Sequence, residues 1–399
     1  MTAATAAEGA TPADEETQTR RLLAAVDSIA SVVEDGASES DRQGQLTDKT
    51  VTALRDHGFW RMRLCRELGG MELTVASQIR VLAALAAVDT SSAWCTMVAN
   101  SAVATLGATM SQSAVERIFA SGVPACSVAA APAGVAIPGT DGYRLTGTWR
   151  LASSIHHAEW LHAVVFVDGD PSRPLPVAIP AHDVEVLDTW HVVGLAGTGS
   201  NDFTLTDYQL PPELVGRAGN PRDLLRGSRR YDLLALDDLE SCEHLAFAIG
   251  VARRALDELL AVLSRGPFGA FGDREVVQVQ LGEAMVSLEA MEATAHAVYK
   301  RVDAAAAGDA SAWSEAERHL PRAVSVWATK RALEVVQLAF QRSGGAALHR
   351  PNIFEKLLRD MSVAATHVMV DDGALAAHAH RNLEFKGSTE PPVRMRRAS

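Results

Sequence analysis

The stretch YRLTGTWRLASSIHHAEWLHAVVFV, residues 143–167, decides the fold, because it interrupts a chain whose pattern is otherwise helical. Two β-type runs, Thr148–Leu151 and Leu161–Val167, lie within it. Pro and Gly are frequent in the wider segment from about Val123 to Val215, and turn signals such as Asp141-Gly142 separate its short runs. These features predict a small antiparallel sheet domain rather than βαβ units.

Helical patterns flank this segment on both sides. Arg21–Val33 repeats apolar residues at three- and four-residue spacing, and Thr47–His57 begins with a capping threonine. Val75–Val88 and Ser91–Thr109 are apolar nearly all round, which predicts two buried helices. Long helices, typical of a bundle, are predicted after the sheet segment. They span Leu233–Leu263, Glu275–Ala307, Trp313–Gly344 and Pro351–Leu383.

The order of these segments predicts a mainly α protein with a central β domain. We expect a disordered tail over residues 1–19 and an N-terminal helical domain over 20–122. The β-sheet domain covers 123–216, a C-terminal four-helix bundle covers 217–385, and a second tail covers 386–399.

Composition excludes several classes of function. The chain has 399 residues, with 37 basic and 49 acidic side chains, and a formal net charge of −12. This acidic balance argues against binding to nucleic acid or to an anionic membrane. No run of apolar residues is long enough to span a bilayer, and no basic segment precedes an apolar one at the start. We therefore expect a cytoplasmic protein without a secretory signal.

The cysteines and glycines carry no recognisable metal or dinucleotide motif. No CxxC pair is present, so we expect buried free thiols in a reducing cytosol rather than a zinc site or disulfides. No GxGxxG unit is visible, which argues against direct use of NAD(P)H. The four cysteines are Cys65, Cys95, Cys126 and Cys242.

Three motifs, in this order, resemble those of the acyl-CoA dehydrogenase fold. Gly147–Ser153, GTWRLAS, is similar to the family's G-x-K-x-W-I-T strand, where a hydroxyl residue bonds the flavin ring near N5. Arg265–Gly269, RGPFG, resembles the R-x-x-F-G turn, whose arginine reaches a flavin phosphate. Gln341–Gly345 followed by Arg359-Asp360 resembles the Q-x-x-G-G … R-D signature. The resemblance covers about Leu22 to Asn382 and implies the same fold.

Further details resemble the reduced-flavin, two-component (group D) monooxygenases of this fold. Asp188–Leu195 and Gly197–Ser200 are similar to segments of that branch. Ala129–Ala136 has no carboxylate or hydroxyl where the dehydrogenases place a T-E-x-x-A-G-S-D loop. Many dehydrogenases have their catalytic glutamate about eight residues beyond the R-D aspartate, where this chain has Val368 beside His367. The monooxygenase branch often uses a histidine on this helix.

The resemblance implies a cofactor, partners and an oligomer. The cofactor is reduced FMN or FAD, with FMN slightly preferred, supplied by a separate NAD(P)H-dependent flavin reductase. O2 is the co-substrate, and a C4a-hydroperoxyflavin oxygenates an aromatic or amine-type small molecule at carbon, nitrogen or sulfur. A homotetramer is expected, with no nucleic acid and no membrane as partners.

The resemblance also assigns candidate site residues. Ser153 is the hydroxyl near flavin N5, with Ser154 the alternative if the register slips by one residue. His367 titrates near neutrality and is the catalytic candidate, and Asp371, four residues later on a helix, either orients it or forms a surface ion pair. Asn100 stands where the branch often has a second histidine. The remaining cofactor-binding candidates are Trp190 as a wall, Arg265 and Arg342 for phosphate, and Gly344 and Gly345 for close approach of the backbone.

Two other functions stay open from the sequence. An FAD-dependent dehydrogenase or desaturase would use Glu240 as its base, because Glu240 precedes Gly250 by ten residues, as the catalytic glutamate does in some dehydrogenases. A flavin-free binding subunit is the third possibility, since a fold does not fix a function.

Overall fold

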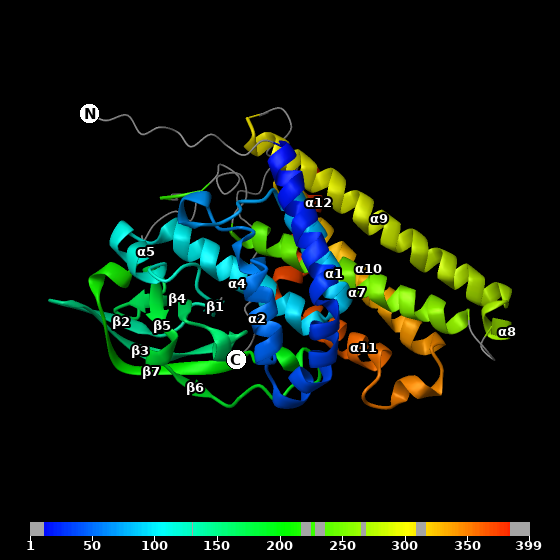
Figure 1. Cartoon of the computed structure of the whole chain (residues 1–399). Coiled ribbons are helices and arrows are strands. Elements are labelled where there is room, and N and C mark those ends of the chain that lie inside the picture. Colours follow the sequence, from blue (N-terminus) through cyan, green and yellow to red (C-terminus); the bar gives the residue numbers. More distant parts are fainter. Residues whose placement is uncertain are drawn as a thin grey trace. The chain divides into compact units, whose positions relative to one another are not determined.

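The computed structural model describes residues 12–129, 131–216, 225–227, 236–264, 269–308 and 317–383. The chain forms two compact units, Met1–Asp232 and Leu233–Ser399, which we call the N-terminal unit and the C-terminal unit (Figure 1). None of the helices in these described ranges is long and apolar enough to cross a membrane. Helices make up most of the described chain and a sheet lies within the N-terminal unit, which confirms the predicted fold class.

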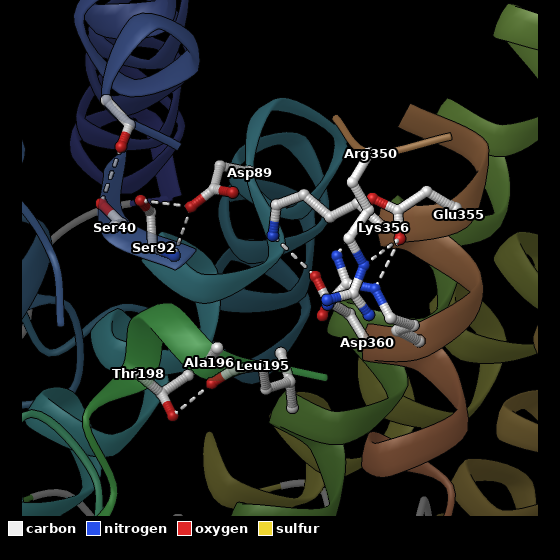
Figure 2. Close-up of polar contacts among 12 residues, drawn as sticks. Ser40, Asp89, Ser92, Leu195, Ala196, Thr198, Arg350, Glu355, Lys356 and Asp360 are labelled. Carbon is white, nitrogen blue, oxygen red and sulfur yellow. Dashed lines mark hydrogen bonds and ion pairs between the residues drawn. The ribbon is translucent and has the colours of Figure 1, made fainter. Parts of the chain in front are cut away.

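Side-chain caps fix the starts of helices in the N-terminal unit. Thr47 accepts the backbone N–H of Thr50 and begins the second helix, as predicted. Asp89 accepts both the backbone N–H and the hydroxyl of Ser92, at 2.8 and 2.7 Å, as Figure 2 shows. The helices of this unit are α1 (Pro12–Gln43), α2 (Asp48–Asp56), α3 (Val75–Val88), α4 (Thr90–Thr109) and α5 (Gln112–Ile118).

Helix α1 corrects the predicted tail over residues 1–19, because it begins at Pro12. Its first turns are anchored by Glu15, whose carboxylate accepts the Thr74 N–H and the Ser77 hydroxyl, both at 2.9 Å. The tail prediction failed because it rested on small and acidic residues, and the contacts that order Glu15 lie about sixty residues away. Helix α4 is buried on nearly every side, as predicted, and packs against the sheet.

The sheet has the strand order β1-β4-β2-β3-β7-β6, with β5 also paired to β4. Strand β4 pairs in parallel with β1 and β2, and the other pairings are antiparallel. Trp149 and Phe203 stack inside it with ring centroids 5.2 Å apart, and both are fully buried. The strands are β1 (Cys126–Val128), β2 (Val135–Gly139), β3 (Gly142–Ala152), β4 (Trp160–Val167), β5 (Pro174–Pro180), β6 (Glu185–Leu187) and β7 (Asn201–Leu210).

The C-terminal unit is a bundle of long helices in which α7 and α10 pack along each other. The predicted starts at Leu233 and Trp313 lie outside the described residues, and α10 begins at Leu320 with proline in its first turn. The helices are α7 (Leu236–Leu263), α8 (Gly269–Gly272), α9 (Glu275–Ala306), α10 (Leu320–Arg342), α11 (Ile353–Ala364) and α12 (Gly373–Asn382).

The predicted helix Pro351–Leu383 is not continuous, which corrects the sequence analysis. Helix α11 ends at Ala364, a short 3-10 helix η11 spans Val368–Val370, and α12 begins at Gly373. His367 and Asp371 have extended backbone, and their side chains accept the N–H groups of Met369 and Gly373. These local bonds compete with a continuous helix.

All four cysteines are buried and free, as predicted. Burial raises the pKa of Cys65 to about 11 and that of Cys95 to about 12, because a thiolate is poorly solvated in the core. These side chains are therefore protonated thiols at neutral pH.

Candidate functional site

The turn after β3 holds Ser153, the predicted flavin-facing hydroxyl. The register of β3 against β7 shifts between Trp149 and Ala152, which marks a β-bulge. Leu151 in this bulge has a φ of 62° and is 55% exposed, and the Asp202 carboxylate accepts its N–H at 3.1 Å. A bulky residue rarely adopts positive φ. The bulge therefore keeps the Leu151 side chain exposed while Ser153 is buried.

Ser153 is one end of a chain of three hydroxyls. The Trp94 indole N–H donates to Ser153 Oγ at 3.2 Å, and Ser153 Oγ lies 2.6 Å from Ser200 Oγ. Ser200 Oγ lies 2.7 Å from Thr198 Oγ1, which donates to the Leu195 carbonyl at 2.8 Å. Figure 2 shows this last contact, between Thr198 and the backbone of the turn before it. We call Ser153, Ser200 and Thr198 the hydroxyl chain.

Backbone bonds hold the ends of the hydroxyl chain in place. The Ser127 hydroxyl donates to the Ser153 carbonyl at 2.6 Å, and the Ser154 N–H donates to the Thr198 carbonyl at 2.8 Å. Ser154 has a φ of 65° and is half-buried. Of the two serines left open by the sequence, Ser153 is the buried member of the network.

Trp190 lies half-buried in the loop before the hydroxyl chain. Its indole N–H donates to the carbonyls of Leu195 and Ala196, each at 3.2 Å. Its backbone N–H donates to Asn201 Oδ1 at 3.0 Å, and Asn201 Nδ2 lies 2.9 Å from His156 Nε2. Partial burial lowers the pKa of His156, which favours its neutral form. Trp190 is thus held in place by the backbone of its own loop and by Asn201.

Asn100 has a structural role that the sequence did not predict. Its Oδ1 accepts the N–H groups of Met62 and Arg63 at 3.0 and 3.4 Å. Its Nδ2 donates to the carbonyls of Phe59 and Thr96 at 2.6 and 3.0 Å. These four bonds use the whole hydrogen-bonding capacity of a fully buried amide. The predicted catalytic use of Asn100 therefore lacks a free donor or acceptor.

In the C-terminal unit, His367 stacks on His244 of α7. The ring centroids are 4.4 Å apart at an interplanar angle of 29°. Nδ1 of His367 accepts the Met369 N–H at 3.3 Å, so the proton of the neutral ring lies on Nε2. Burial lowers the pKa of His367 to about 4. Burial and then the neighbouring His367 hold the pKa of His244 well below its usual value. Both imidazoles are neutral at physiological pH.

Asp371 does not orient His367, which was one of the two roles predicted for it. Asp371 is exposed, and its Oδ1 accepts the N–H of Gly373, the first residue of α12, at 2.8 Å. The break after α11 removes the helical face that would have joined it to His367. Glu240, the base of the alternative dehydrogenase, is half-buried on α7 and precedes His244 by one helical turn.

The candidate phosphate ligands are only partly described. Arg265 lies outside the described residues. The Arg342 guanidinium donates from Nε to Gln280 at 3.0 Å and lies 6.0 Å from the ring centroid of Phe271. At Gly344 φ is 86°, which favours glycine, and a side chain at Gly345 would meet no atom within 4 Å.

Two ion pairs order helix α11 in the C-terminal unit (Figure 2). Lys356 donates to the fully buried Asp360 at 2.7 Å. Arg359 pairs with Glu355 through two nitrogens, at 2.6 and 3.2 Å. Both pairs have i, i+4 spacing, which places their members on one face of the helix.

A flavin fits the groups that the N-terminal unit presents. Its ring has apolar faces and a polar edge, which suit aromatic or aliphatic walls and hydrogen-bonding side chains. Ser153 Oγ bonds the Trp94 indole N–H and the Ser200 hydroxyl, and among the described residues no third hydrogen-bond partner occupies its remaining position. The exposed Leu151 and the half-buried Trp190 supply apolar surface in the segments beside the hydroxyl chain.

Comparison with known families agrees with the fold. The acyl-CoA dehydrogenase N-terminal domain matches residues 15–118, and the acyl-CoA dehydrogenase C-terminal domain matches residues 243–372. Together these two matches cover more than half of the chain. The chain belongs to the acyl-CoA dehydrogenase superfamily.

The relatives of this chain show which class of enzyme within the superfamily it is similar to. A pigment production hydroxylase of a Rhodococcus species is 26% identical over 88% of this chain and 92% of its own length. The oxygenase component of an FADH2-dependent resorcinol hydroxylase from a Rhizobium species is 25% identical over 92% of this chain and 95% of its own. The structure of XiaF from a Streptomyces species, solved with FADH2 and glycerol, superposes with a TM-score of 0.84. It is 23% identical and covers 93% of this chain and 97% of that one, which shows a shared fold.

Sequence reasoning missed Ser200, Thr198 and His244 as site residues. Ser200 and Thr198 lie in the quoted Gly197–Ser200 motif, whose hydroxyls alternate in a glycine-rich loop. His244 directly follows Glu243 and precedes an apolar run of α7, and polar residues at buried positions of a helix are the signal that would have found it.

Proposed function

We propose that this protein is the oxygenase component of a two-component flavin-dependent monooxygenase that hydroxylates an aromatic or amine-type small molecule. The observation that carries the proposal is the buried Ser153 hydroxyl, held by two hydrogen bonds with one hydrogen-bonding position left for a ligand. Relatives that span almost the whole chain and are hydroxylases support the reaction class.

The residues of the chain have distinct tasks in this proposal. When bound, the reduced flavin supplies the two electrons that let one oxygen atom of O2 enter the substrate while the other leaves as water. Ser153 bonds the polar edge of the ring, and Trp190 and Leu151 provide its apolar walls. His367 donates a hydrogen bond from Nε2 to the reacting groups in the site. Its Nδ1 is not available for this, because it already accepts the Met369 N–H.

The cofactor and its supply form the second part of the proposal. We favour reduced FMN over FAD, with Arg342 binding phosphate and Gly344 and Gly345 allowing close approach. A separate NAD(P)H-dependent reductase supplies the reduced flavin. This is supported by the resorcinol hydroxylase relative, which is the oxygenase component of an FADH2-dependent system. The four free, buried thiols suit a cytoplasmic location.

A homotetramer is the proposed assembly. Helix α9 exposes Val276, Val279 and Val286, which are 60%, 55% and 65% exposed and follow one face of the helix. Exposed apolar rows of this kind mark protein interaction surfaces. Light scattering of the wild type and of Val279→Glu would test it, and a monomeric wild type would contradict it.

The function is tested by loading the protein anaerobically with reduced FMN and mixing it with oxygenated buffer and resorcinol. We expect hydroxylated product, and a transient absorbance that precedes the spectrum of oxidised FMN. Ser153→Ala should lower coupled product formation about tenfold or more, because one bond to the ring is lost. Product from the wild type at the level of a protein-free control would contradict the proposal if a panel of phenols, indoles and amines gave the same result.

The dehydrogenase alternative predicts a different pattern. Tightly held oxidised FAD, reduction of that FAD by an acyl thioester, and loss of this reduction in Glu240→Gln would favour it. The half-buried position of Glu240 on α7 is its structural support. The monooxygenase proposal expects no reduction by a thioester and normal product formation in Glu240→Gln.

A further inference from the structure

We infer that Thr198 and Ser200 are positioning residues that fix the Ser153 hydroxyl as a hydrogen-bond acceptor, so that the site selects reduced flavin over oxidised flavin. The inference rests on the proposed function, because it requires Ser153 to face N5 of a flavin ring. It assigns the direction of each bond in the hydroxyl chain by counting protons.

The direction of the hydrogen bonds in the hydroxyl chain is set at Thr198. A hydroxyl has one proton and two lone pairs. Thr198 Oγ1 lies 2.8 Å from the Leu195 carbonyl oxygen, which can only accept, so the Thr198 proton lies on this contact. Without it, two oxygens would face each other at hydrogen-bond distance with no proton between them. Thr198 Oγ1 therefore accepts in its 2.7 Å contact with Ser200.

This direction passes along the chain to Ser153. Ser200 gives its proton to Thr198, so Ser200 Oγ accepts in the 2.6 Å contact with Ser153. The Ser153 proton is then committed to Ser200. The Trp94 indole N–H can only donate, and it occupies one lone pair of Ser153 Oγ. What Ser153 can offer to a ligand is its second lone pair.

Burial prevents the chain from reversing. Ser153, Ser200 and Thr198 are 6%, 3% and 1% exposed, so bulk water does not supply alternative partners. A reversed chain would leave the contact between Thr198 and the Leu195 carbonyl without a proton. A mismatch of this kind is more costly in a buried network than in water.

The two redox states of a flavin differ at the atom concerned. N5 of reduced flavin carries a hydrogen and donates, whereas N5 of oxidised flavin has only a lone pair and accepts. A hydroxyl fixed as an acceptor can bond the N5–H of reduced flavin, but it faces the N5 lone pair of oxidised flavin without a proton between the two atoms. The hydroxyl chain would therefore favour entry of the reduced flavin that a reductase supplies and release of the oxidised flavin that remains after turnover.

Dissociation constants of reduced and oxidised FMN, measured anaerobically and aerobically on the purified full chain, test this inference. We expect the wild type to bind reduced FMN about tenfold more tightly or better, the ratio that one mismatched buried hydrogen bond produces. Thr198→Val removes the hydroxyl that sets the direction of the hydroxyl chain and keeps the shape of the side chain. Ser200 can then donate to Ser153, and Ser153 can donate to the ligand. The ratio should fall about tenfold, mainly through tighter binding of oxidised FMN.

Two further variants separate proton direction from a general disturbance. Thr198→Ser keeps the hydroxyl and should restore the wild-type ratio. Thr50→Val is the matched control, because Thr50 is equally buried, at 1% exposure, and its hydroxyl bonds Thr47 outside the chain. It should leave the ratio unchanged.

The outcomes distinguish this inference from the proposed function. A wild type that binds both forms equally, or a Thr198→Val ratio equal to the wild-type ratio, would overturn the inference and leave the proposed function standing. A wild type that binds neither form would overturn the proposed function and the inference together.

Discussion

The hydroxyl chain of the N-terminal unit and the imidazole pair of the C-terminal unit control protons in different ways. In the hydroxyl chain, every proton has a fixed direction because a carbonyl at one end accepts and an indole at the other end donates. In the pair of His244 and His367, burial removes the proton that each ring would otherwise gain near neutral pH. One region fixes the direction of a hydrogen bond, and the other fixes a charge state.

The difference predicts how each region responds to pH. Serine and threonine hydroxyls do not titrate in the range where proteins fold, so the hydroxyl chain keeps its direction. Imidazoles titrate once the pH approaches their lowered pKa, which is about 4 for His367. Acid therefore acts on the imidazole pair before it acts on the hydroxyl chain.

The largest expected effect tests whether His367 acts as a neutral donor. His367→Ala should lower coupled product formation by about a hundredfold or more. His367→Gln should keep part of the activity, because its amide N–H can replace the Nε2–H. The wild-type rate should stay level from about pH 8 to 5, since the ring is neutral above a pKa of about 4. Product formation over this pH range, measured for all three proteins, checks the prediction.

A base would behave differently in the same experiment. If His367 removed a proton from the substrate, the glutamine variant would be as inactive as the alanine variant. A fall in the wild-type rate with a midpoint near pH 6.5 would show instead that the pKa of His367 is not lowered in the folded protein. Either result would contradict the prediction that His367 acts as a neutral hydrogen-bond donor with a lowered pKa.

A lone imidazole separates the effect of burial from that of pairing. His162 on β4 is 7% exposed, its Nε2 has no hydrogen-bond partner among the described residues, and burial lowers its pKa to about 4. The unfolded chain binds this proton near pH 6.5, so acid favours unfolding below that pH. Between pH 7.5 and 4.5 the free energy of unfolding should fall by about 2 to 3 kcal/mol from His162 alone.

His162→Leu should remove this part of the acid sensitivity, because the apolar side chain does not titrate. Urea unfolding of both proteins at pH 7.5 and 4.5 gives the four free energies required. Equal losses of stability on acidification in the two proteins would show that His162 is protonated in the folded state, contrary to the burial argument.

The smallest expected effect concerns the bulge that presents Ser153. Asp202→Ala removes the acceptor of the Leu151 N–H and should cost about 1 kcal/mol of stability, whereas Asp202→Asn keeps an acceptor oxygen and should cost less. Both variants should leave the pH dependence due to the imidazoles unchanged. Thermal unfolding at pH 7.5 and 5 compares them, and a loss in Asp202→Asn as large as in Asp202→Ala would show that charge, not the bond, supports the bulge.

Much of the fold was predictable because period and turn chemistry are local signals. The sheet segment and buried α4 followed from residue patterns within about twenty residues. The break near His367 was not predicted, because an apolar helix-like pattern continues through a segment whose side chains bond their own backbone. Helix α1 began earlier than predicted because its first turn is held by Thr74 and Ser77.

The site was predictable only as far as its motif extends. Ser153 followed from the resemblance, but the partners that give its hydroxyl a direction lie 47 and 59 residues away along the chain. The stacking of His244 on His367 joins residues more than a hundred positions apart. Asn100 was assigned to catalysis from its position on α4, and only the structure shows that the backbone of another segment uses its amide completely.

The buried cysteines bear on how long such an enzyme survives its own chemistry. An oxygenase that consumes reduced flavin without hydroxylating its substrate releases hydrogen peroxide. Peroxide oxidises thiolates far faster than thiols. Cys95, whose Sγ lies 3.8 Å from the Thr198 carbonyl, has a pKa near 12 and so presents almost no thiolate beside the hydroxyl chain. Uncoupled turnover of the proposed enzyme would therefore oxidise this thiol only slowly.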